Sequence, residues 1–179
     1  EDIDLGEVNQ VFFITRNPAM PPVTKLDSAS AAAAFMLGES IQTSAGDPDA
    51  AGEAIRVVGT NPFIVGSEGA EGNRFRDLIE ALDVECYLLN TGRVGERDIG
   101  VTESVTILRE LARGSVSWRE DGDTGLSVPA DLPGIDIEAF DVTENLPDAT
   151  GRLADLREER RAYLAAFDDL DDTIVEAVY

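Results

Sequence analysis

Hydrophobic positions in this chain fall into short apolar runs and into helical spacings, separated by loops. Residues 11–14 form a continuous run of β-branched and aromatic residues, and residues 84–89 form a second, mostly apolar run. Such runs are typical of strands that are covered on both faces. Between them, Asp27 can cap an alanine-rich helix over residues 28–37, and Gly38 can end it. The chain therefore mixes strands with helices.

Four further segments have apolar residues at helical spacing. Asn73 can cap one helix, and Thr102 can cap another that ends at Gly114. Two amphipathic helices are predicted over residues 153–167 and 170–178, where charged residues fill the positions between the apolar ones. We predict a mixed α/β (α+β) fold in which helices flank a mixed sheet.

Two loops interrupt these elements. Pro18, Pro21 and Pro22 each lack a backbone donor and bias the preceding residue away from helix, so residues 15–26 are predicted to be a loop. Residues 90–100 contain three glycines, which permit a positive φ or a close approach of the backbone to a ligand. The second loop is therefore a candidate functional loop.

The length of 179 residues suits one domain with a sizeable core and is too short for two ordinary domains. Between residues 116 and 145, Gly, Pro and Asp break the chain into short extended pieces that we expect to cap the fold. We assign residues 1–147 to one domain and residues 148–179 to a C-terminal helical tail.

The charge pattern narrows the setting in which the chain works. It has 36 acidic and 14 basic residues, a formal net charge of −22, and Lys25 as its only lysine. High salt would screen the self-repulsion of such a surface, so we expect a salt-adapted protein that folds weakly at low salt. An ordinary acidic domain remains the alternative. Nucleic acid is an unfavourable partner, because binding to it depends on Lys and Arg neutralising phosphates.

Cysteine usage and hydropathy exclude several classes of protein. Cys86 is the only cysteine and lies in an apolar run, so no internal disulfide can form and we predict a buried core residue. No apolar stretch reaches the roughly 18 residues that span a bilayer, and no signal-peptide pattern is present. We expect a soluble, cytoplasmic protein without a membrane partner. The first residue is Glu1 rather than methionine, which fits a segment of a longer protein.

Short motifs occur at four ordered places in the chain. They are Phe-Ile-Thr-Arg-Asn and Pro-Pro-Val-Thr-Lys-Leu at 13–17 and 21–26, Leu-Leu-Asn-Thr-Gly and Gly-Glu-Arg at 88–92 and 95–97, Ser104 with Arg-Gly-Ser-Val at 113–116, and Leu-Ser-Val-Pro and Leu-Pro-Gly-Ile at 126–129 and 132–135. Taken in order, over roughly residues 8–147, they resemble the ATP-dependent phosphoenolpyruvate carboxykinases. The chain departs from the family pattern at Asn17, where the family has aspartate, and at Glu96, where it has lysine.

The resemblance implies a fold and an activity. Residues 1–147 would be the C-terminal part of the mononucleotide-binding domain of a phosphoenolpyruvate carboxykinase, and the acidic composition would point to a haloarchaeal source. That family converts oxaloacetate and ATP to phosphoenolpyruvate, CO2 and ADP in gluconeogenesis, as a carboxy-lyase that uses Mg²⁺ and Mn²⁺. The expected partners are ATP, oxaloacetate or phosphoenolpyruvate, and the missing N-terminal part of the same enzyme.

The family's catalytic motifs are not found in this sequence. It contains no histidine and no Gly-x-x-x-x-Gly-Lys-[Ser/Thr] phosphate loop. Phosphoryl transfer needs such groups to neutralise charge, so the metal ligands and catalytic residues are expected upstream of this chain. We therefore assign no catalytic residue and no metal ligand here, and we expect the isolated chain to be inactive.

Five residues are candidate site residues by the resemblance. Arg97, the main chain at Asp98 and the hydroxyl of Ser104 would contact the nucleotide, Arg97 through charge-assisted hydrogen bonds. Thr24 and Lys25 match a loop that would close over bound substrates as a lid.

Each of these residues also has a structural interpretation. Arg97 can be a solvated arginine paired with Glu96 or Asp98, and Ser104 can support the start of a helix. Thr24 and Lys25 can do no more than stiffen a proline loop. For the whole chain, the alternatives to an enzyme portion are a non-catalytic nucleotide-binding module derived from the same fold and a purely structural or interaction domain.

Overall fold

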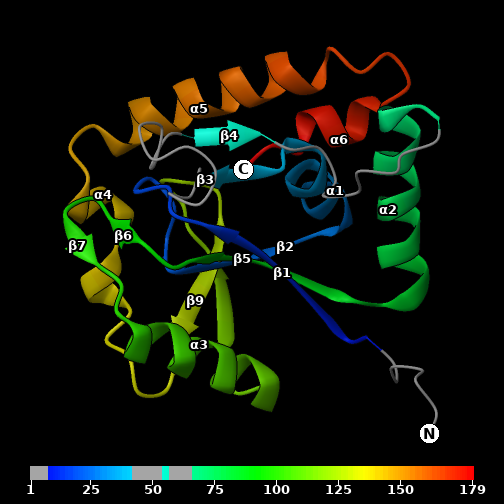
Figure 1. Ribbon diagram of the computed structural model, residues 1–179. Coiled ribbons are helices and arrows are strands. Elements are labelled where there is room, and N and C mark those ends of the chain that lie inside the picture. Colours follow the sequence, from blue (N-terminus) through cyan, green and yellow to red (C-terminus); the bar gives the residue numbers. More distant parts are fainter. Residues whose placement is uncertain (1–7, 42–53, 57–65) are drawn as a thin grey trace, which may run out of the picture.

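The computed structural model describes residues 8–41, 54–56 and 66–179 (Figure 1). At its centre is a five-stranded sheet in the order β1-β5-β2-β9-β8. The strands are β1 (Gln10–Thr15), β5 (Glu85–Asn90), β2 (Val23–Leu26), β9 (Ser127–Asp131) and β8 (Ser117–Glu120). Strands β1 and β5 are parallel, and the other neighbours are antiparallel. The predicted mixed sheet is confirmed.

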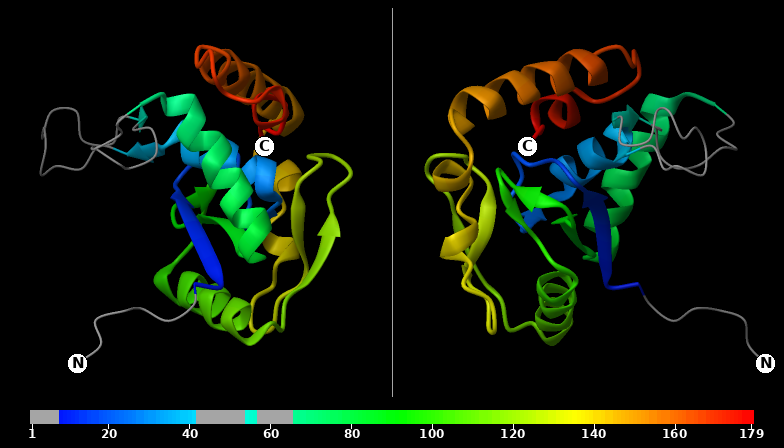
Figure 2. Two further views of the ribbon diagram at one scale, coloured as in Figure 1. Left: turned by 90° about the vertical axis from the view of Figure 1, so that its right-hand side faces the viewer. Right: turned by 60° about the vertical axis from the view of Figure 1, so that its left-hand side comes forward.

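Helices cover both faces of this sheet (Figures 1 and 2). Helix α3 (Val101–Arg113) packs on one face. Helices α1 (Ser28–Leu37) and α2 (Glu68–Leu82) pack on the other, and α5 (Ala149–Leu164) and α6 (Asp172–Glu176) pack against α1. The predicted α/β class, with helices flanking the sheet, is confirmed.

Strand β5 shows how the two layers form. Cys86 and Leu88 face the cluster that contains the buried alanines of α1, whereas Tyr87 and Leu89 face the cluster that contains Ile107 of α3. Alternate side chains of a strand point to opposite faces of the sheet, so a continuous apolar run serves both layers. The buried position predicted for Cys86 is confirmed, and burial raises the pKa of its thiol to about 11.

Local capping residues determine where helix α1 begins and ends. The side chain of Asp27 accepts a hydrogen bond from the amide of Ser30 at 2.7 Å, and Gly38 ends the helix in a left-handed conformation with φ of 50°. Both ends match the prediction. Gly114 ends α3 in the same way, with φ of 65°.

Three local predictions were wrong. Residues 23–26 form β2 rather than loop, because this segment pairs with β5 on one side and with β9 on the other. Helix α2 is capped by Ser67, not by Asn73, whose side chain instead donates to the carbonyl of Asp169 at 2.7 Å. Helix α3 begins after Gly100 without a side-chain cap, so Thr102 does not cap it.

Short elements complete the described chain. Strands β3 (Glu39–Ile41) and β4 (Ala54–Arg56) pair with each other, as do β6 (Arg93–Val94) and β7 (Arg97–Asp98). The 3-10 helix η2 (Glu138–Phe140) and helix α4 (Val142–Asn145) lead into α5. They lie in the region in which short extended pieces were predicted, so that prediction was wrong for residues 138–140 and 142–145, which are helical.

The C-terminal segment is tied to the core by Arg160 of α5, which is fully buried. Its guanidinium donates from Nε to Oε1 of Glu39 at 2.8 Å and lies 4.2 Å from the centre of the Tyr179 ring. It also donates to the carbonyl oxygen of Tyr179. Leu153 and Leu164 of α5 belong to the same core cluster as α1. The division of the chain at residues 147 and 148 stays a prediction.

Candidate functional site

The carboxyl ends of the two parallel strands lie together. Thr15 at the end of β1 and Asn90 at the end of β5 are register partners. The loops that follow, residues 16–22 and 91–100, therefore leave the sheet at the same edge. In open α/β sheets, ligands bind outside the carboxyl ends of parallel strands. A ligand-binding site is therefore expected at this edge.

Asn90 holds the two loops to each other and is fully buried. Its Nδ2 lies within hydrogen-bonding distance of the carbonyl oxygens of Asn17 (3.0 Å), Met20 (2.8 Å) and Arg93 (2.9 Å). Its Oδ1 accepts a hydrogen bond from the amide of Gly92 at 3.0 Å. A single side chain thus joins the proline loop to the hairpin that follows β5.

The β6-β7 hairpin is fixed on its other side by Gly95. The amide of Gly95 donates to the carbonyl of Pro18 at 2.8 Å, and Gly95 has a φ of 54°. A Cβ at this position would lie 1.8 Å from the carbonyl oxygen of Asn145 at the end of α4. Only glycine combines this conformation with so close an approach. The hairpin is therefore seated between the proline loop and α4.

Arginines gather in these loops although the chain is strongly acidic. Arg16 follows β1, Arg93 is in β6 and Arg97 is in β7, and all three are exposed. Arg97 places its guanidinium 4.7 Å from the centre of the Phe140 ring. Among the described residues, no ion pair involves any of the three. Arg97 thus stacks on an aromatic ring rather than pairing with Glu96 or Asp98.

Ser104 lies in the first turn of α3, beside the hairpin. Its Oγ donates to the carbonyl of Gly100 at 3.1 Å, which leaves the oxygen able to accept but commits its proton. A Cβ on Gly100 would lie 2.5 Å from Oε2 of Glu103, so this carboxylate covers the start of the helix. Asp98 is exposed in β7. Arg97, Asp98 and the start of α3 are thus neighbours along one short stretch after β5.

Thr24 and Lys25 lie elsewhere, within β2. Lys25 is the register partner of Tyr87, three residues before Asn90, which is about 10 Å along the strand at roughly 3.3 Å per residue. Its Nζ contacts Oε1 of Glu85 at 2.8 Å, and this contact is the main reason that the pKa of Glu85 is lowered. Thr24 is 1 % exposed, and its Oγ1 has no hydrogen-bond partner among the described groups. The structure does not bring Lys25 to the hairpin of Arg97.

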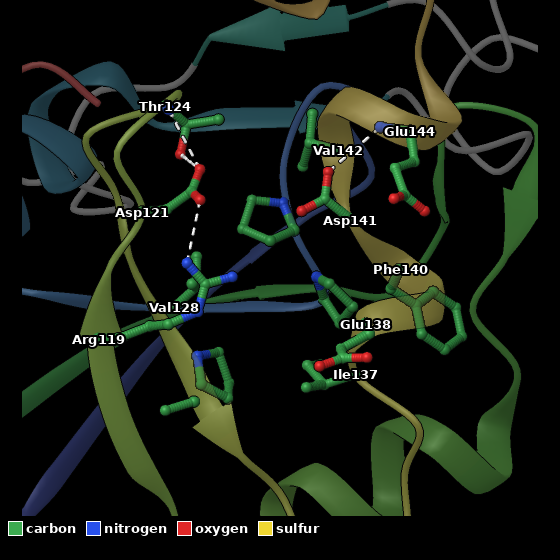
Figure 3. A pocket seen from close by; sticks show the side chains of 14 residues that line it. Arg119, Asp121, Thr124, Val128, Ile137, Glu138, Phe140, Asp141, Val142 and Glu144 are labelled. Carbon is green, nitrogen blue, oxygen red and sulfur yellow. Dashed lines mark hydrogen bonds and ion pairs between the residues drawn. The ribbon is translucent and has the colours of Figure 1, made fainter.

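A cavity of about 300 Å³ lies between the proline loop, the β8-β9 ribbon and residues 137–144 (Figure 3). On one side, Arg119 Nη1 contacts Asp121 Oδ1 at 3.1 Å. On the other, the cavity is lined by Glu138 of η2 and by Asp141, which caps the start of α4. Phe140 lines this cavity, and the guanidinium of Arg97 stacks on its ring. The ring therefore connects the arginine cluster to a hollow in the surface.

Sequence reasoning missed the structural roles of Asn90 and Phe140. Asn90 appeared only as part of a motif, although an asparagine between a buried strand and a glycine is a recognisable loop signal. Phe140 carried no signal, because its partner Arg97 lies more than forty residues earlier in the chain.

The described residues offer no metal centre. In the part of the chain that the structure describes, no group of three or more His, Cys, Asp or Glu side chains is placed to hold a metal ion. Divalent cations bind through several such oxygen or nitrogen ligands. The described residues thus do not fit the divalent metals that the resemblance implies. Separately, no described helix is both long and apolar enough to cross a membrane.

Comparisons with known proteins agree on one family. The family model of phosphoenolpyruvate carboxykinase matches residues 1–138. The chain is 34% identical over 166 residues to the phosphoenolpyruvate carboxykinase (ATP) of Aeropyrum pernix, a match that covers 90% of this chain and 33% of that enzyme. It is 31% identical over 140 residues to the enzyme of the same name from Rhodopseudomonas palustris strain BisB18, covering 72% of this chain and 26% of that enzyme. The chain thus spans about a third or less of the length of these relatives, and it belongs to the phosphoenolpyruvate carboxykinase family.

Proposed function

We propose that this chain is the nucleotide-side portion of an ATP-dependent phosphoenolpyruvate carboxykinase, a carboxy-lyase that converts oxaloacetate and ATP to phosphoenolpyruvate, CO2 and ADP in gluconeogenesis. The observation that carries the proposal is the arginine cluster at the carboxyl ends of β1 and β5. Arg16, Arg93 and Arg97 lie there on loops that Asn90 holds together. A polyphosphate is the ligand that such a cluster suits, because guanidinium groups pair with phosphate oxygens.

Within this site, Arg97 would contact the nucleotide directly. Its stacking on Phe140 orients the guanidinium and leaves its outer N–H groups exposed for charge-assisted hydrogen bonds. The main chain at Asp98 and the hydroxyl oxygen of Ser104 would complete the contacts, Ser104 as an acceptor because its proton is already donated to Gly100. The chain itself would bind and orient the nucleotide and exclude water from it.

The proposed lid needs a different boundary from the predicted one. Strand β2 is hydrogen-bonded on both sides, so Thr24 and Lys25 cannot move without breaking the sheet. We propose that residues 16–22 close over substrate only together with the β6-β7 hairpin, to which Asn90 ties them, and that Thr24 and Lys25 form the fixed base. Closure of this kind excludes water from the reacting groups.

The remaining machinery would come from the part of the enzyme that this chain does not span. Mg²⁺ and Mn²⁺, which would supply charge neutralisation at the phosphates, need ligands from outside the described residues. We further propose that the enzyme works in the cytoplasm of a salt-adapted, haloarchaeal organism, because the formal net charge of this chain, −22, suits a medium in which ions screen repulsion.

The test is equilibrium titration of the chain with ATP and Mg²⁺ in molar KCl. We expect weak, saturable binding that Arg97→Ala reduces roughly 10- to 100-fold, the loss expected for one hydrogen bond to a charged group. Arg152→Ala, which removes an exposed arginine of α5, is the matched control and should leave binding unchanged. Absence of saturable binding by the folded wild-type chain, or equal affinities of the two variants, would contradict the proposal and favour a structural domain.

A further inference from the structure

Helix α5 carries three arginines within little more than one turn, and one of them differs from the other two. Arg160 contacts Oε2 of Glu39 at 2.5 Å, and Arg161 contacts Oε2 of Glu176 at 3.3 Å. Arg157 forms no ion pair with any residue that the structure describes. Its positive charge is therefore the one of the three that has no carboxylate partner in the described part of the chain.

The surroundings of Arg157 make this lack of a partner unusual. Arg152 of the same helix also has no ion pair among the described residues, but it is exposed, whereas Arg157 is half-buried. Burial, together with the charges of Arg161 and Arg160, lowers the pKa of Arg157. Its Nη2 donates to the carbonyl oxygen of Thr124, although a guanidinium has five N–H donors. A partly buried cation of this kind gains stability from a bound anion.

A cavity of about 460 Å³ lies beside Arg157. Its walls come from β2, the start of α1, residues 125–127, α5 and the C-terminal residues 177–179. Leu26, Leu126 and Val178 make part of the wall apolar. In Figures 1 and 2, the C-terminal end of the chain lies under α5. A volume of this size is sufficient for a small organic molecule.

Thr24 is a second unsatisfied group at this cavity. Because alternate residues of a strand share a face, Thr24 projects to the same side of β2 as Leu26, which belongs to the core cluster of α1. Thr24 lines the cavity, is 1 % exposed, and has no hydrogen-bond partner for Oγ1 among the described groups. A buried hydroxyl without a partner is unfavourable. Because Oγ1 is shielded from solvent, a turn of the side chain would accompany its contact with a ligand.

The other charged groups at the cavity are already engaged. Oδ1 of Asp27 accepts a hydrogen bond from the amide of Ser30 at 2.7 Å, which holds this carboxylate at the start of α1. Nζ of Lys25 contacts Glu85 at 2.8 Å. In molar salt, charges are screened over about 3 Å, so the net charge of the chain does not repel an anion that touches a guanidinium directly. Arg157 is therefore the charge that is available to a ligand.

We propose that this cavity binds a small molecule through its carboxylate or phosphate group, with Arg157 as the charged contact and Thr24 as a hydroxyl donor. Both groups present oxygen atoms that a guanidinium binds in pairs. A bound anion would connect α5 and the C-terminal residues to β2, and it would thereby stabilise the packing of this segment on the sheet. Arg16, Arg93 and Arg97 do not line the cavity, so the proposal goes beyond the proposed function and does not depend on it.

The experiment measures anion binding to the chain in molar KCl without nucleotide. Inorganic phosphate and succinate are titrated separately, and binding is followed by calorimetry and by the NMR chemical shifts of the backbone amides. Arg157→Gln removes the charge, and Arg157→Lys keeps the charge but not the paired donors. Arg152→Gln removes an exposed arginine of the same helix and is the matched control.

We expect at least one of the two anions to bind saturably and to shift the amides of residues 24–27, 125–127 and 177–179. The anion that binds more tightly identifies the group as phosphate or carboxylate. Arg157→Gln should weaken binding at least tenfold, as expected for the loss of hydrogen bonds to a charged group, and Arg157→Lys should weaken it less. Arg152→Gln should bind like the wild type.

Three results would overturn the proposal. They are the absence of saturable binding of both anions, amide shifts confined to residues 16–22 and 91–97, and a folded Arg157→Gln variant that binds like the wild type. The shifts are mapped on the wild-type chain, so the test does not depend on the folding of a variant. Arg97→Ala should leave the shifts at this cavity unchanged, which separates a failure here from a failure of the ATP titration.

Discussion

Replacing Gly95 with alanine tests how the β6-β7 hairpin is held. The substitution adds one methyl group to a residue whose φ is 54°, in a hairpin that contacts α4. The added Cβ would lie 1.8 Å from the carbonyl oxygen of Asn145 and 2.4 Å from its carbonyl carbon. Real Cβ atoms do not approach backbone so closely. Either the hairpin or α4 must therefore move.

Two effects combine in this variant. The left-handed conformation costs an alanine about 1–2 kcal/mol, and forcing an extra carbon into a packed contact costs about 1–3 kcal/mol. Together they predict a loss of about 2–5 kcal/mol, a large share of the ~5–15 kcal/mol that stabilises an ordinary domain. Arg97 follows Gly95 by two residues, so the same displacement should move its guanidinium off the Phe140 ring and weaken ATP binding.

Gly114→Ala provides the matched control. Gly114 has a φ of 65°, and a Cβ at that position meets nothing within 4 Å. It should therefore show only the conformational cost of about 1–2 kcal/mol. Urea unfolding in molar KCl, followed by circular dichroism, measures both variants. If Gly95→Ala is no more destabilising than Gly114→Ala, the close contact with Asn145 has no energetic consequence, and the hairpin is not fixed as described.

Three further variants or reagents probe other parts of the molecule. Arg160→Ala should lower the free energy of unfolding by about 3–5 kcal/mol in a urea titration, because it removes a fully buried side chain that hydrogen-bonds Glu39 and packs on the Tyr179 ring, and a loss below 1 kcal/mol would contradict this account. The backbone amide of Thr173 and the guanidinium of Arg76 lower the pKa of Asp171 from 3.8 to about 2. The ionised carboxylate therefore stabilises the fold above pH about 4, and this stabilisation is lost as the pH falls toward 2. In a plot of the unfolding midpoint against pH, Asp171→Asn should accordingly reduce the fall on the acid side. An unchanged plot would contradict this role of Asp171. Burial raises the pKa of the Cys86 thiol to about 11, so this thiol reacts slowly while the core is folded. Because we expect the fold to weaken at low salt, iodoacetamide should label Cys86 at least tenfold more slowly in molar KCl than after the salt is removed. Equal rates would show that low salt does not open the core.

Local signals in the sequence were sufficient for some elements. Asp27 and Gly38 act within their own helix, so the limits of α1 could be predicted from neighbouring residues alone. Strand β2 could not, because its four residues follow prolines and become a strand only through pairing with β5 and β9. Tertiary contacts decided the outcome there.

The start of α2 shows the same limit. Two glycines, Gly69 and Gly72, make its first turns look unfavourable for a helix, so the cap was placed too late, at Asn73. In the fold, a Cβ on Gly69 would lie 2.6 Å from the backbone of Leu170, and one on Gly72 would lie 2.7 Å from the sulfur of Met36. The glycines let the helix pack closely against distant segments, which the local pattern does not reveal.

For the candidate site, the resemblance pointed to the loop of Arg97 but not to the residues that support this loop. Arg97 does lie in a glycine-containing hairpin after a buried strand, as the motif indicated. The Phe140 ring, on which the guanidinium of Arg97 stacks, and the side-chain amide of Asn90, which contacts the carbonyl of Asn17, each connect residues that are far apart in sequence. Such connections depend on the sheet order, which periodicity alone does not give.

The side chain of Asn90 makes the two loops mechanically dependent on each other. The side-chain amide of Asn90 contacts the carbonyl oxygens of Asn17, Met20 and Arg93. Neither the proline loop nor the hairpin can therefore move away without breaking its contact with Asn90. Under the proposed function, a displacement of the proline loop on substrate binding would be transmitted to the hairpin of Arg97, and a nucleotide that moves Arg97 would displace the proline loop. The binding of nucleotide and the binding of substrate would then be coupled through the buried side-chain amide of Asn90.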